Sequence, residues 1–269
     1  MTNVSPIKID TTDGRLPMKG KGLEMTEFAN TAELRRNQLE KLAAGFRMFA
    51  YFGFNEGVAG HITLRDPEFP DHFWVNPLGV HFSQISVSDL ILVNHEGKVV
   101  QGDKDVNVAA FAIHSRLHAA RPDVNAAAHS HSIYGRTFST LGKPLDPISQ
   151  DACAFYETQA MYKEFSGVVE EINEGDEIAK ALGDKKVIIL QNHGILTTGP
   201  SVDIALWFYM SMERCCQAQL MAEAAGTPVI IPHETAVKTR DFIANDIAAW
   251  ASYQPAYDMI IKREPDLLD

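Results

Sequence analysis

The sequence predicts an α/β protein, a single three-layer domain with a mixed sheet between helices, and three observations lead to this prediction. Helix-like and strand-like hydrophobic patterns alternate along most of the chain. The early strand-like segments follow one another as in a meander, whereas the later ones are separated by helices long enough to form crossovers. The chain has 269 residues, of which 45% are hydrophobic and 22% charged, so it can bury the core of such a domain.

The chain is predicted to begin with an arm. Residues 1–30 show no sustained hydrophobic period and mix Gly, Pro, Thr and charged side chains. We expect a flexible N-terminal arm there, followed by the folded domain over residues 31–269.

The first helix is predicted to begin after Asn30. This residue lies three positions before Glu33, the spacing of a capping box. Apolar residues then recur at three- and four-residue steps from Leu39 to Phe49, until Gly53 breaks the period. These features predict a helix of about twenty residues.

Short apolar segments then predict four strands, which is typical of a meander. His95-Glu96-Gly97 separates the last two and fits a hairpin turn. The predicted strands cover residues 62–65, 73–75, 90–93 and 98–101.

The second half of the chain alternates helices with strands. A helix begins near Val108 and must stop before Pro122, which restricts the residue ahead of it. Residues 187–190 are the most apolar strand candidate, as expected for a strand covered on both faces. The remaining predictions are a strand over 124–130 and helices over 133–141, 178–182, 203–225 and 235 to about 250.

The composition argues against nucleic acid and membranes as partners. The formal charge is −11, which repels phosphate backbones and anionic lipid, and no apolar stretch approaches the ~20 residues of a membrane span. The three cysteines are an odd number without a metal or redox spacing, which excludes a disulfide framework. Because the first residues do not resemble a secretory signal, the protein is predicted to be cytoplasmic.

His129-Ser130-His131 is the first pattern that suggests chemistry. Residues two apart in a strand point to the same face about 6.6 Å apart, so both imidazoles can converge on one metal ion. Random placement of the ten histidines would still give about 0.4 such pairs. A partly exposed strand edge is therefore the alternative interpretation.

His193 is the second candidate ligand. It lies between Asn192 and Gly194, directly after the apolar strand of residues 187–190, and ligands of α/β proteins gather beyond the carboxyl ends of strands. As a third ligand it would complete a catalytic metal site that keeps an open position. The alternative is a histidine that only forms part of a turn.

Five stretches together resemble the class II aldolase and adducin head-domain family. They occur in order over most of the chain, and their combination is specific although each one alone is not. The stretches are Glu56–Arg65, Asn76–Gly79, Ile113-His114 with Ala120–Val124, His129–His131 and Asn192–Gly194.

The resemblance implies a single-domain α/β/α fold, a homotetramer and a small-molecule substrate. It also implies a divalent metal ion held by His129, His131 and His193, with zinc favoured and manganese or iron as alternatives. Residues at the positions that match the family's pocket would bind the substrate, namely His61, Asn76, Gly79, His114 and Asn192.

The chain departs from the sugar-phosphate aldolases of this family at three positions. Their acid/base glutamate corresponds to Ala110, which cannot move a proton. The asparagine and serine with which they hold phosphate correspond to His61 and Leu78. These departures predict an unphosphorylated substrate, and a Gly-His pair such as Gly60-His61 is also found in adducin-like members.

Asp151 and Glu157 are the candidates for the missing acid/base function. They lie in a loop-rich segment downstream of the His-x-His strand, and such segments often border sites on a rigid scaffold. Because the chain carries 35 carboxylates, a plain surface role is the alternative for both.

The leading hypothesis is a divalent-metal-dependent carbon–carbon lyase, of the aldolase or decarboxylase type, that acts on a small unphosphorylated carbonyl or carboxylate compound. A metal ion on three neutral imidazoles can stabilise the enolate that both reactions form. The alternative is a non-catalytic, adducin-like interaction protein with a vestigial metal site. The aromatic segment 207–212 is expected to pack in the helix core or between subunits, and segment 250–253 is expected to contribute to a subunit contact.

Overall fold

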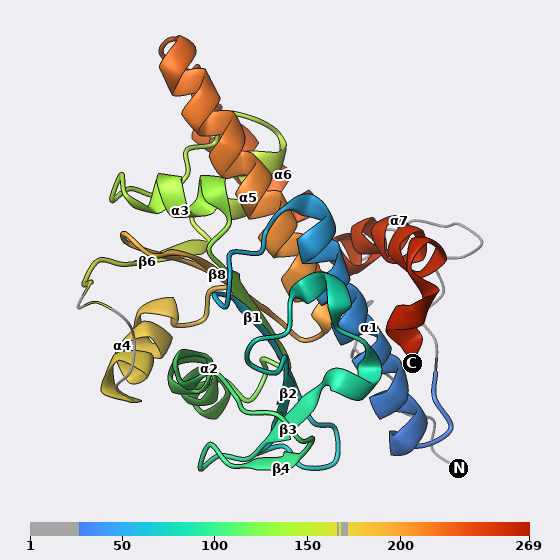
Figure 1. Ribbon diagram of the computed structural model, residues 1–269. Coiled ribbons are helices and arrows are strands. Elements are labelled where there is room, and N and C mark those ends of the chain that lie inside the picture. The colour runs from blue at the N-terminus through green and yellow to red at the C-terminus, as the bar shows by residue number, and fades with distance from the viewer. Residues whose placement is uncertain (1–26, 166, 168–171) are drawn as a thin grey trace.

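The computed structural model describes residues 27–165, 167 and 172–269. Its strands are β1 His61–Arg65, β2 Phe73–Val75, β3 Ile91–Val93, β4 Val99–Gln101, β5 Ala126–Ser130, β6 Gln159–Tyr162, β7 Val187–Leu190 and β8 Gly194–Gly199. They form one sheet with the order β4-β3-β2-β1-β5-β8-β7-β6 (Figure 1). Neighbouring strands are antiparallel except β6 and β7, which are parallel, so the predicted mixed sheet is confirmed.

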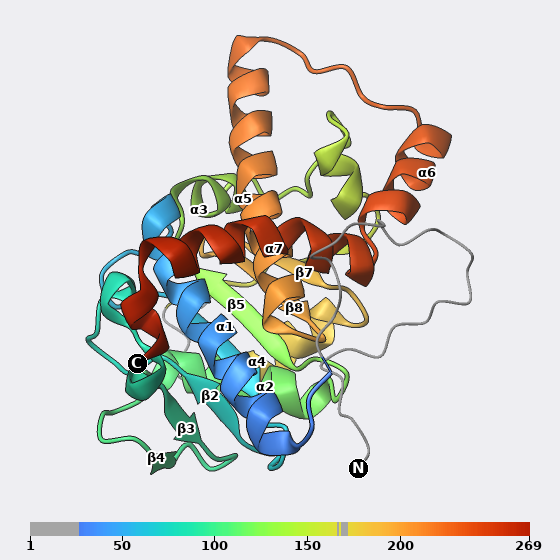
Figure 2. The ribbon, with the colours of Figure 1, turned by 90° about the vertical axis from the view of Figure 1, so that its right-hand side faces the viewer.

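Helices cover both faces of this sheet and give the domain three layers. The helices are α1 Thr31–Phe52, α2 Val108–Ala120, α3 Ile133–Ser139, α4 Ile172–Leu182, α5 Val202–Ala225, α6 His233–Ile243 and α7 Asp246–Arg263. Helices α2 and α4 pack against each other and on strand residues such as Ala127 and Leu196. Helices α1, α5 and α7 share a larger core with Ile62 and Ala128 on the opposite face (Figure 2).

Helix α1 begins where the sequence predicts. The Asn30 side chain accepts a hydrogen bond from the Glu33 N–H at 2.9 Å, and the Glu33 carboxylate accepts one from the Ala29 N–H. Gly53 ends the helix with a φ of 74°, a left-handed conformation that glycine adopts at little cost. Both predicted ends of this helix are confirmed.

Three predictions for the second half of the chain are wrong. The sequence does not predict β6 or β8, because the buried Gly and Thr residues of β8 show neither alternation nor a long apolar run. Helix α4 begins at Ile172 rather than at residue 178. The helix predicted from residue 235 is two helices, since Asn245 caps α7 by accepting from the Ala248 N–H at 2.9 Å.

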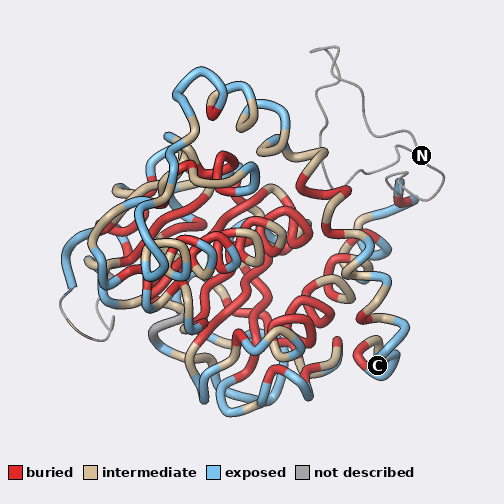
Figure 3. Tube along the Cα trace, turned by 90° about the horizontal axis from the view of Figure 1, so that it is seen from above, coloured by how far each residue is buried: buried red, intermediate tan, exposed pale blue. Residues whose placement is uncertain are grey.

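Buried residues are concentrated in the strands and in the helix faces that pack on them (Figure 3). Phe208, Tyr209 and Met212 of α5 are buried, which confirms core packing for most of segment 207–212. Trp250 and Tyr253 of α7 are also buried within the chain, which leaves these two side chains little surface for the predicted subunit contact. All three cysteines are buried as well.

The predicted arm is described only at its end. Residues 1–26 lie outside the described residues, whereas Phe28 is buried and Asn30 caps α1, so the packed structure already includes them. None of the helices that the structure describes is long and apolar enough to cross a lipid bilayer.

Candidate functional site

The candidate site lies at one end of the central strands, on the sheet face that α2 covers. His61 at the start of β1 pairs with His129 near the end of β5, so both side chains lie on the same face. His131 follows the last residue of β5, and His193 lies in the short turn between β7 and β8. Because β5 and β8 are hydrogen-bonded neighbours, this turn lies beside the end of β5.

His129, His131 and His193, here called the histidine triad, form a compact group of donors. One ring nitrogen of each lies within 4.8 Å of the others, and the Nε2 atoms of His131 and His193 are 3.0 Å apart. Tetrahedral zinc with ~2.0–2.1 Å bonds to nitrogen separates its ligand nitrogens by about 3.3 Å. The triad therefore fits a zinc-like ion, and it is the one such donor group among residues 27–165, 167 and 172–269.

The backbone sets the orientation of the His129 ring. Its Nδ1 donates to the carbonyl oxygen of Ile195 at 2.8 Å, which leaves Nε2 as a bare nitrogen for a metal ion. Gly60, with a φ of 107°, lets the loop before β1 approach the backbone of β5 closely, since a Cβ there would lie 3.2 Å from the His129 carbonyl oxygen. Two neighbouring strands thus fix the ligand before any metal binds.

Burial lowers the pKa of all three triad imidazoles and is the largest cause at each. The neighbouring His131 lowers the pKa of His193 further, to about 4. The neighbouring histidines lower the pKa of His129 further, and Arg136 lowers that of His131 further. The rings are therefore neutral near neutral pH, which is the form that binds metals.

A buried network behind the triad was not predicted. Tyr209 of α5 donates its hydroxyl proton to the Ser130 carbonyl oxygen at 3.0 Å. Glu213, one turn later, accepts from the Ser132 hydroxyl at 2.6 Å and from the Gly135 N–H at 2.6 Å. The network holds the residues on both sides of His131, and its one signal in the sequence is a Glu one turn after a Tyr on the same helix.

His61 and His114, predicted to bind substrate, lie next to the triad. The His61 ring centroid is 5.8 Å from that of His114 and 6.3 Å from that of His129. Both are buried, and His61 Nδ1 and His114 Nε2 have no hydrogen-bond partner among the described residues. Unpaired buried nitrogens are costly, so their presence here marks a place where a ligand group can bind.

The other predicted substrate residues lie in loops at this end of the sheet. Asn76 follows β2, which is antiparallel to β1, so it lies toward the end where His61 begins β1; its Oδ1 is buried without a partner among the described residues. Gly79 continues this loop with a φ of 81°, and Asn192, with a φ of 59°, precedes His193. The structure thus brings these loop residues to the end of the sheet where the triad lies.

Comparison with known proteins agrees with this arrangement. The family model described as Class II Aldolase and Adducin N-terminal domain matches residues 40–220. The chain belongs to this family. The match runs from within α1 through most of α5 and includes every residue of the triad.

Similar proteins carry the names of enzymes. Decarboxylase NovR of Streptomyces niveus is 43% identical over 89% of this chain and 90% of its own length. A 4-hydroxy-3-prenylphenylpyruvate oxygenase/4-hydroxy-3-prenylbenzoate synthase of Streptomyces roseochromogenus is 42% identical over 89% and 87%. The structure of an L-fuculose 1-phosphate aldolase from Glaciozyma antarctica is 44% identical over 91% and 96%, with a TM-score of 0.84. This chain is accordingly a lyase of the class II aldolase type.

The two carboxylates predicted to act as acid/base lie elsewhere. Glu157 precedes β6, which starts beside the first residue of β7, whereas His193 lies beyond the last residue of β7. Glu157 is exposed and lies 3.4 Å from Arg240. Asp151 is exposed at the start of the short helix η3 Asp151–Phe155, which packs against α6. Within one chain the structure does not bring either carboxylate to the triad.

The position of the family's acid/base glutamate falls on α2. Ala110 lies in this helix one turn before His114, and its side-chain surroundings lie outside the described residues. His114 is fully buried and is the α2 side chain whose ring lies against His61. Helix α2 carries no carboxylate, and the charged groups that act on the triad are Glu56 and Arg136, which shift the pKa of His131 in opposite directions.

Proposed function

We propose that this protein is a divalent-metal-dependent carbon–carbon lyase that holds one ion, zinc first and manganese or iron second, on His129, His131 and His193. The observation that carries the proposal is the convergence of three neutral ring nitrogens within 4.8 Å, one of them oriented by the Ile195 carbonyl. When bound, the ion supplies a Lewis acid that stabilises the negative charge of an enolate.

The surrounding residues suit such chemistry. The three imidazoles add no negative charge, so the full positive charge of the ion remains available to a substrate that chelates through two oxygens. His61 and Asn76 are buried and border the site, which excludes bulk water from one side of the substrate. Exclusion of water strengthens the electrostatic interactions of the pocket with that substrate.

The substrate is a small, unphosphorylated carbonyl or carboxylate compound. His61 stands where the aldolases hold phosphate and is buried, and burial keeps its pKa well below the usual value and its ring uncharged. Leu78 stands at the second such position and offers no hydrogen bond. With Ala110 in place of the glutamate, loss of carbon dioxide or of an aldehyde from an acid is the favoured reaction.

Cleavage of a phosphorylated ketose is the second candidate. The observation that favours it is the 44% identity with the structure named as an L-fuculose 1-phosphate aldolase. The two candidates differ in substrate and share the same metal site.

The proposal includes a homotetramer in the cytoplasm. Large apolar side chains are exposed on the far end of α5, the loop after it and α6, which extend beyond the sheet (Figure 1). Exposed apolar side chains in one region are typical of subunit contacts. The residues are Met221, Val229, Ile230 and Phe242.

The test combines metal loading with a substrate panel. Metal-free protein is reloaded with zinc, manganese or iron and assayed with unphosphorylated 2-oxo and hydroxy acids and with L-fuculose 1-phosphate. We expect metal-dependent release of carbon dioxide or an aldehyde from an acid, retained by His95→Ala and lost by His131→Ala. Efficient cleavage of the phosphate ester alone would replace the first candidate with the second, and metal-independent turnover would overturn both.

A further inference from the structure

A chain of hydrogen bonds runs from the site into the core between β1 and α2. Thr63 Oγ1 lies 2.7 Å from His114 Nδ1 and 2.9 Å from His118 Nε2. His118 Nδ1 lies 3.2 Å from the carbonyl oxygen of Val124. The side chains of Thr63, His114 and His118 are all buried. The Phe73 ring stacks on the His118 ring, with ring centroids 5.6 Å apart, and holds it in place.

The hydrogen bond between His118 and the Val124 carbonyl oxygen fixes where every proton of this series lies. A carbonyl oxygen only accepts, so His118 Nδ1 carries a proton and His118 Nε2, in the neutral ring, is bare. Thr63 donates its single hydroxyl proton to that bare nitrogen. The Thr63 oxygen therefore accepts from His114 Nδ1, and Nε2 of a neutral His114 has no proton.

Both rings are neutral. Burial, reinforced by His118, lowers the pKa of His114 to about 3, and burial, reinforced by Arg65, lowers that of His118 to about 3. The reverse order, in which Thr63 donates to His114, requires a doubly protonated His118 in a buried position beside Arg65. The buried environment therefore selects one direction of donation along these hydrogen bonds.

The bare nitrogen lies on the side of the His114 ring away from Thr63. Thr63 is the second residue after His61 on the same face of β1, and the His114 ring also lies against the His61 ring, with centroids 5.8 Å apart. The His61 ring is perpendicular to the His114 ring, at 89°. His114 is 0% exposed, so its unpaired Nε2 gains a partner only when the side chains around it make room for a ligand group.

We propose that His114 is a specificity-determining residue, held by Thr63 and His118 so that its Nε2 accepts a hydrogen bond from a hydroxyl group of the substrate. This inference rests on the proposed function and narrows its substrates to hydroxyl-bearing carbonyl or carboxylate compounds. An ether, carboxylate or phosphate oxygen at this position would meet a bare lone pair and is disfavoured.

The first test reads the proton positions without any substrate. Nitrogen-15 NMR of the zinc-loaded full-length protein, labelled at histidine, reports whether each ring nitrogen carries a proton, and His114→Gln assigns the His114 signals. Near neutral pH we expect a protonated Nδ1 and a bare Nε2 at His114. A protonated Nε2 overturns the proposal.

The second test measures selectivity with matched probes. The probes are 2-oxo acids with a hydroxyl on successive carbons, each beside its deoxy analogue and its methyl ether, titrated into zinc-loaded protein. For one position of the hydroxyl, we expect the hydroxy acid to bind about tenfold more tightly than its deoxy analogue or its methyl ether, because the buried His114 Nε2 is otherwise left without a donor. Thr63→Ser should keep this preference, and Thr63→Val should reduce it to about twofold or less.

Thr197→Val is the matched control. Thr197 is also buried in a strand and donates to the Ala205 carbonyl oxygen at 2.7 Å, outside the histidine chain. It should lower stability and leave the tenfold preference unchanged. A hydroxyl preference that survives Thr63→Val overturns the proposal for His114 alone, whereas failure of the whole series to bind shows that the proposed function is wrong as well.

Discussion

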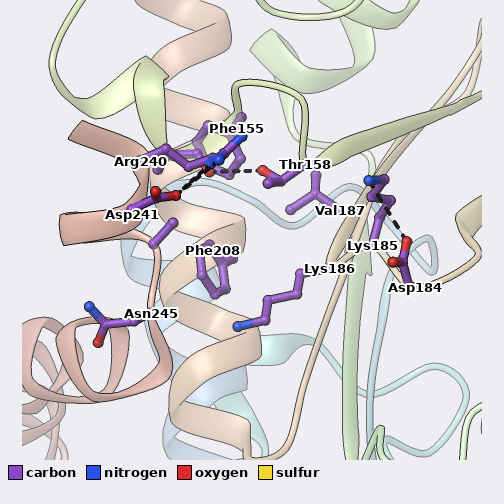
Figure 4. A pocket seen from close by; sticks show the side chains of 12 residues that line it. Phe155, Thr158, Asp184, Lys185, Lys186, Val187, Phe208, Arg240, Asp241 and Asn245 are labelled. Atoms are coloured by element: carbon purple, nitrogen blue, oxygen red, sulfur yellow. Dashed lines mark hydrogen bonds and ion pairs between the residues drawn. The ribbon is translucent and has the colours of Figure 1, made fainter. Parts of the chain in front are cut away.

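The two ends of β7 carry different kinds of polar group. Beyond Leu190 lie the triad, His61 and His114, which are neutral histidines, two of them with buried ring nitrogens that have no partner among the described residues. Beyond Val187 lies a cavity of about 430 Å³ with charged side chains around an apolar floor. Figure 4 shows Arg240 on one side of this cavity and Lys186 on the other, with Phe208 between them.

The charges around the cavity are already paired. Arg240 contacts Glu157 at 3.4 Å and Asp241 at 3.0 Å, and Lys186 forms an ion pair with Asp246. Lys185 donates to the Glu157 carbonyl oxygen at 3.2 Å. The cations therefore have partners in the folded chain, as is typical of groups that stabilise the packing of surface elements.

The difference teaches that charges paired with one another argue for packing, whereas unpaired buried nitrogens beside a cluster of metal donors argue for chemistry. The cavity offers about 430 Å³ of space, but its charged groups are satisfied. The triad end has polar atoms that are buried at a cost and that gain partners only when an ion or ligand binds. Each of the following predictions tests this contrast.

The largest effect is expected for removal of a metal ligand. His131→Ala should abolish stoichiometric metal binding, a larger loss than the ~10–100-fold that follows removal of a residue that only hydrogen-bonds a ligand. Metal analysis after gel filtration measures this, with His95→Ala, at an exposed histidine, as the control. Unchanged metal content in His131→Ala would mean that the ligands are misassigned.

Acid should destabilise the metal-free protein through its buried histidines. His114 and His118 have a pKa of about 3 when folded and about 6.5 when unfolded, so below about pH 6.5 the unfolded state binds more protons. Their contribution is fully present above pH 6.5 and is lost as the pH falls toward 3. From about pH 7 to 5.5 the free energy of unfolding should fall by about 2–3 kcal/mol for these two residues.

Urea unfolding at several pH values measures this fall. His118→Gln should reduce the slope between about pH 6.5 and 5 by close to one proton. A slope unchanged by that substitution would contradict the neutral, buried state of His118.

The network behind the triad should contribute to stability. Glu213→Ala leaves the Gly135 N–H and the Ser132 hydroxyl without their acceptor, which should lower the free energy of unfolding by about 3 kcal/mol. Glu223→Ala, on the same helix and paired with Lys143 at the surface, should cost about 1 kcal/mol or less. Equal losses in denaturant unfolding would show that the buried network is not special.

The smallest effect is expected at the other end of β7. Glu157→Gln and Asp151→Asn should leave kcat/KM within about twofold of wild type, because neither carboxylate lies at the triad within one chain. A loss of about 10²-fold or more in either variant would match a general acid or base and would indicate that a neighbouring subunit brings that carboxylate to the site.

The sequence predicts the elements whose signals are local. Asn30 and Gly53 mark the ends of α1, and the two-residue spacing of His129 and His131 predicts that both rings reach one site, although His131 already lies beyond the last residue of β5. Strand β8 escapes prediction because it begins at Gly194 and pairs with distant β5, so its burial is decided by tertiary structure.

The candidate site is likewise predictable only where its signals are local in the sequence. The triad follows from residue types and strand ends, but Glu213 lies 82 positions beyond His131 on a helix whose pattern indicates only packing. The proton order in the Thr63 chain depends on Val124, and no periodicity relates those two residues. Nearness in sequence to the His-x-His strand also misleads for Glu157, because β6 runs parallel to β7 and starts at its far end.

The central claim is that three histidines hold one catalytic metal ion. X-ray absorption and anomalous diffraction from crystals of the zinc-loaded protein test it most directly. We expect one zinc per chain, bonded to Nε2 of His129, His131 and His193 at ~2.0–2.2 Å, with the remaining coordination position open to solvent or substrate. Zinc bound at other residues, or no ordered zinc at the triad at full loading, would contradict the account.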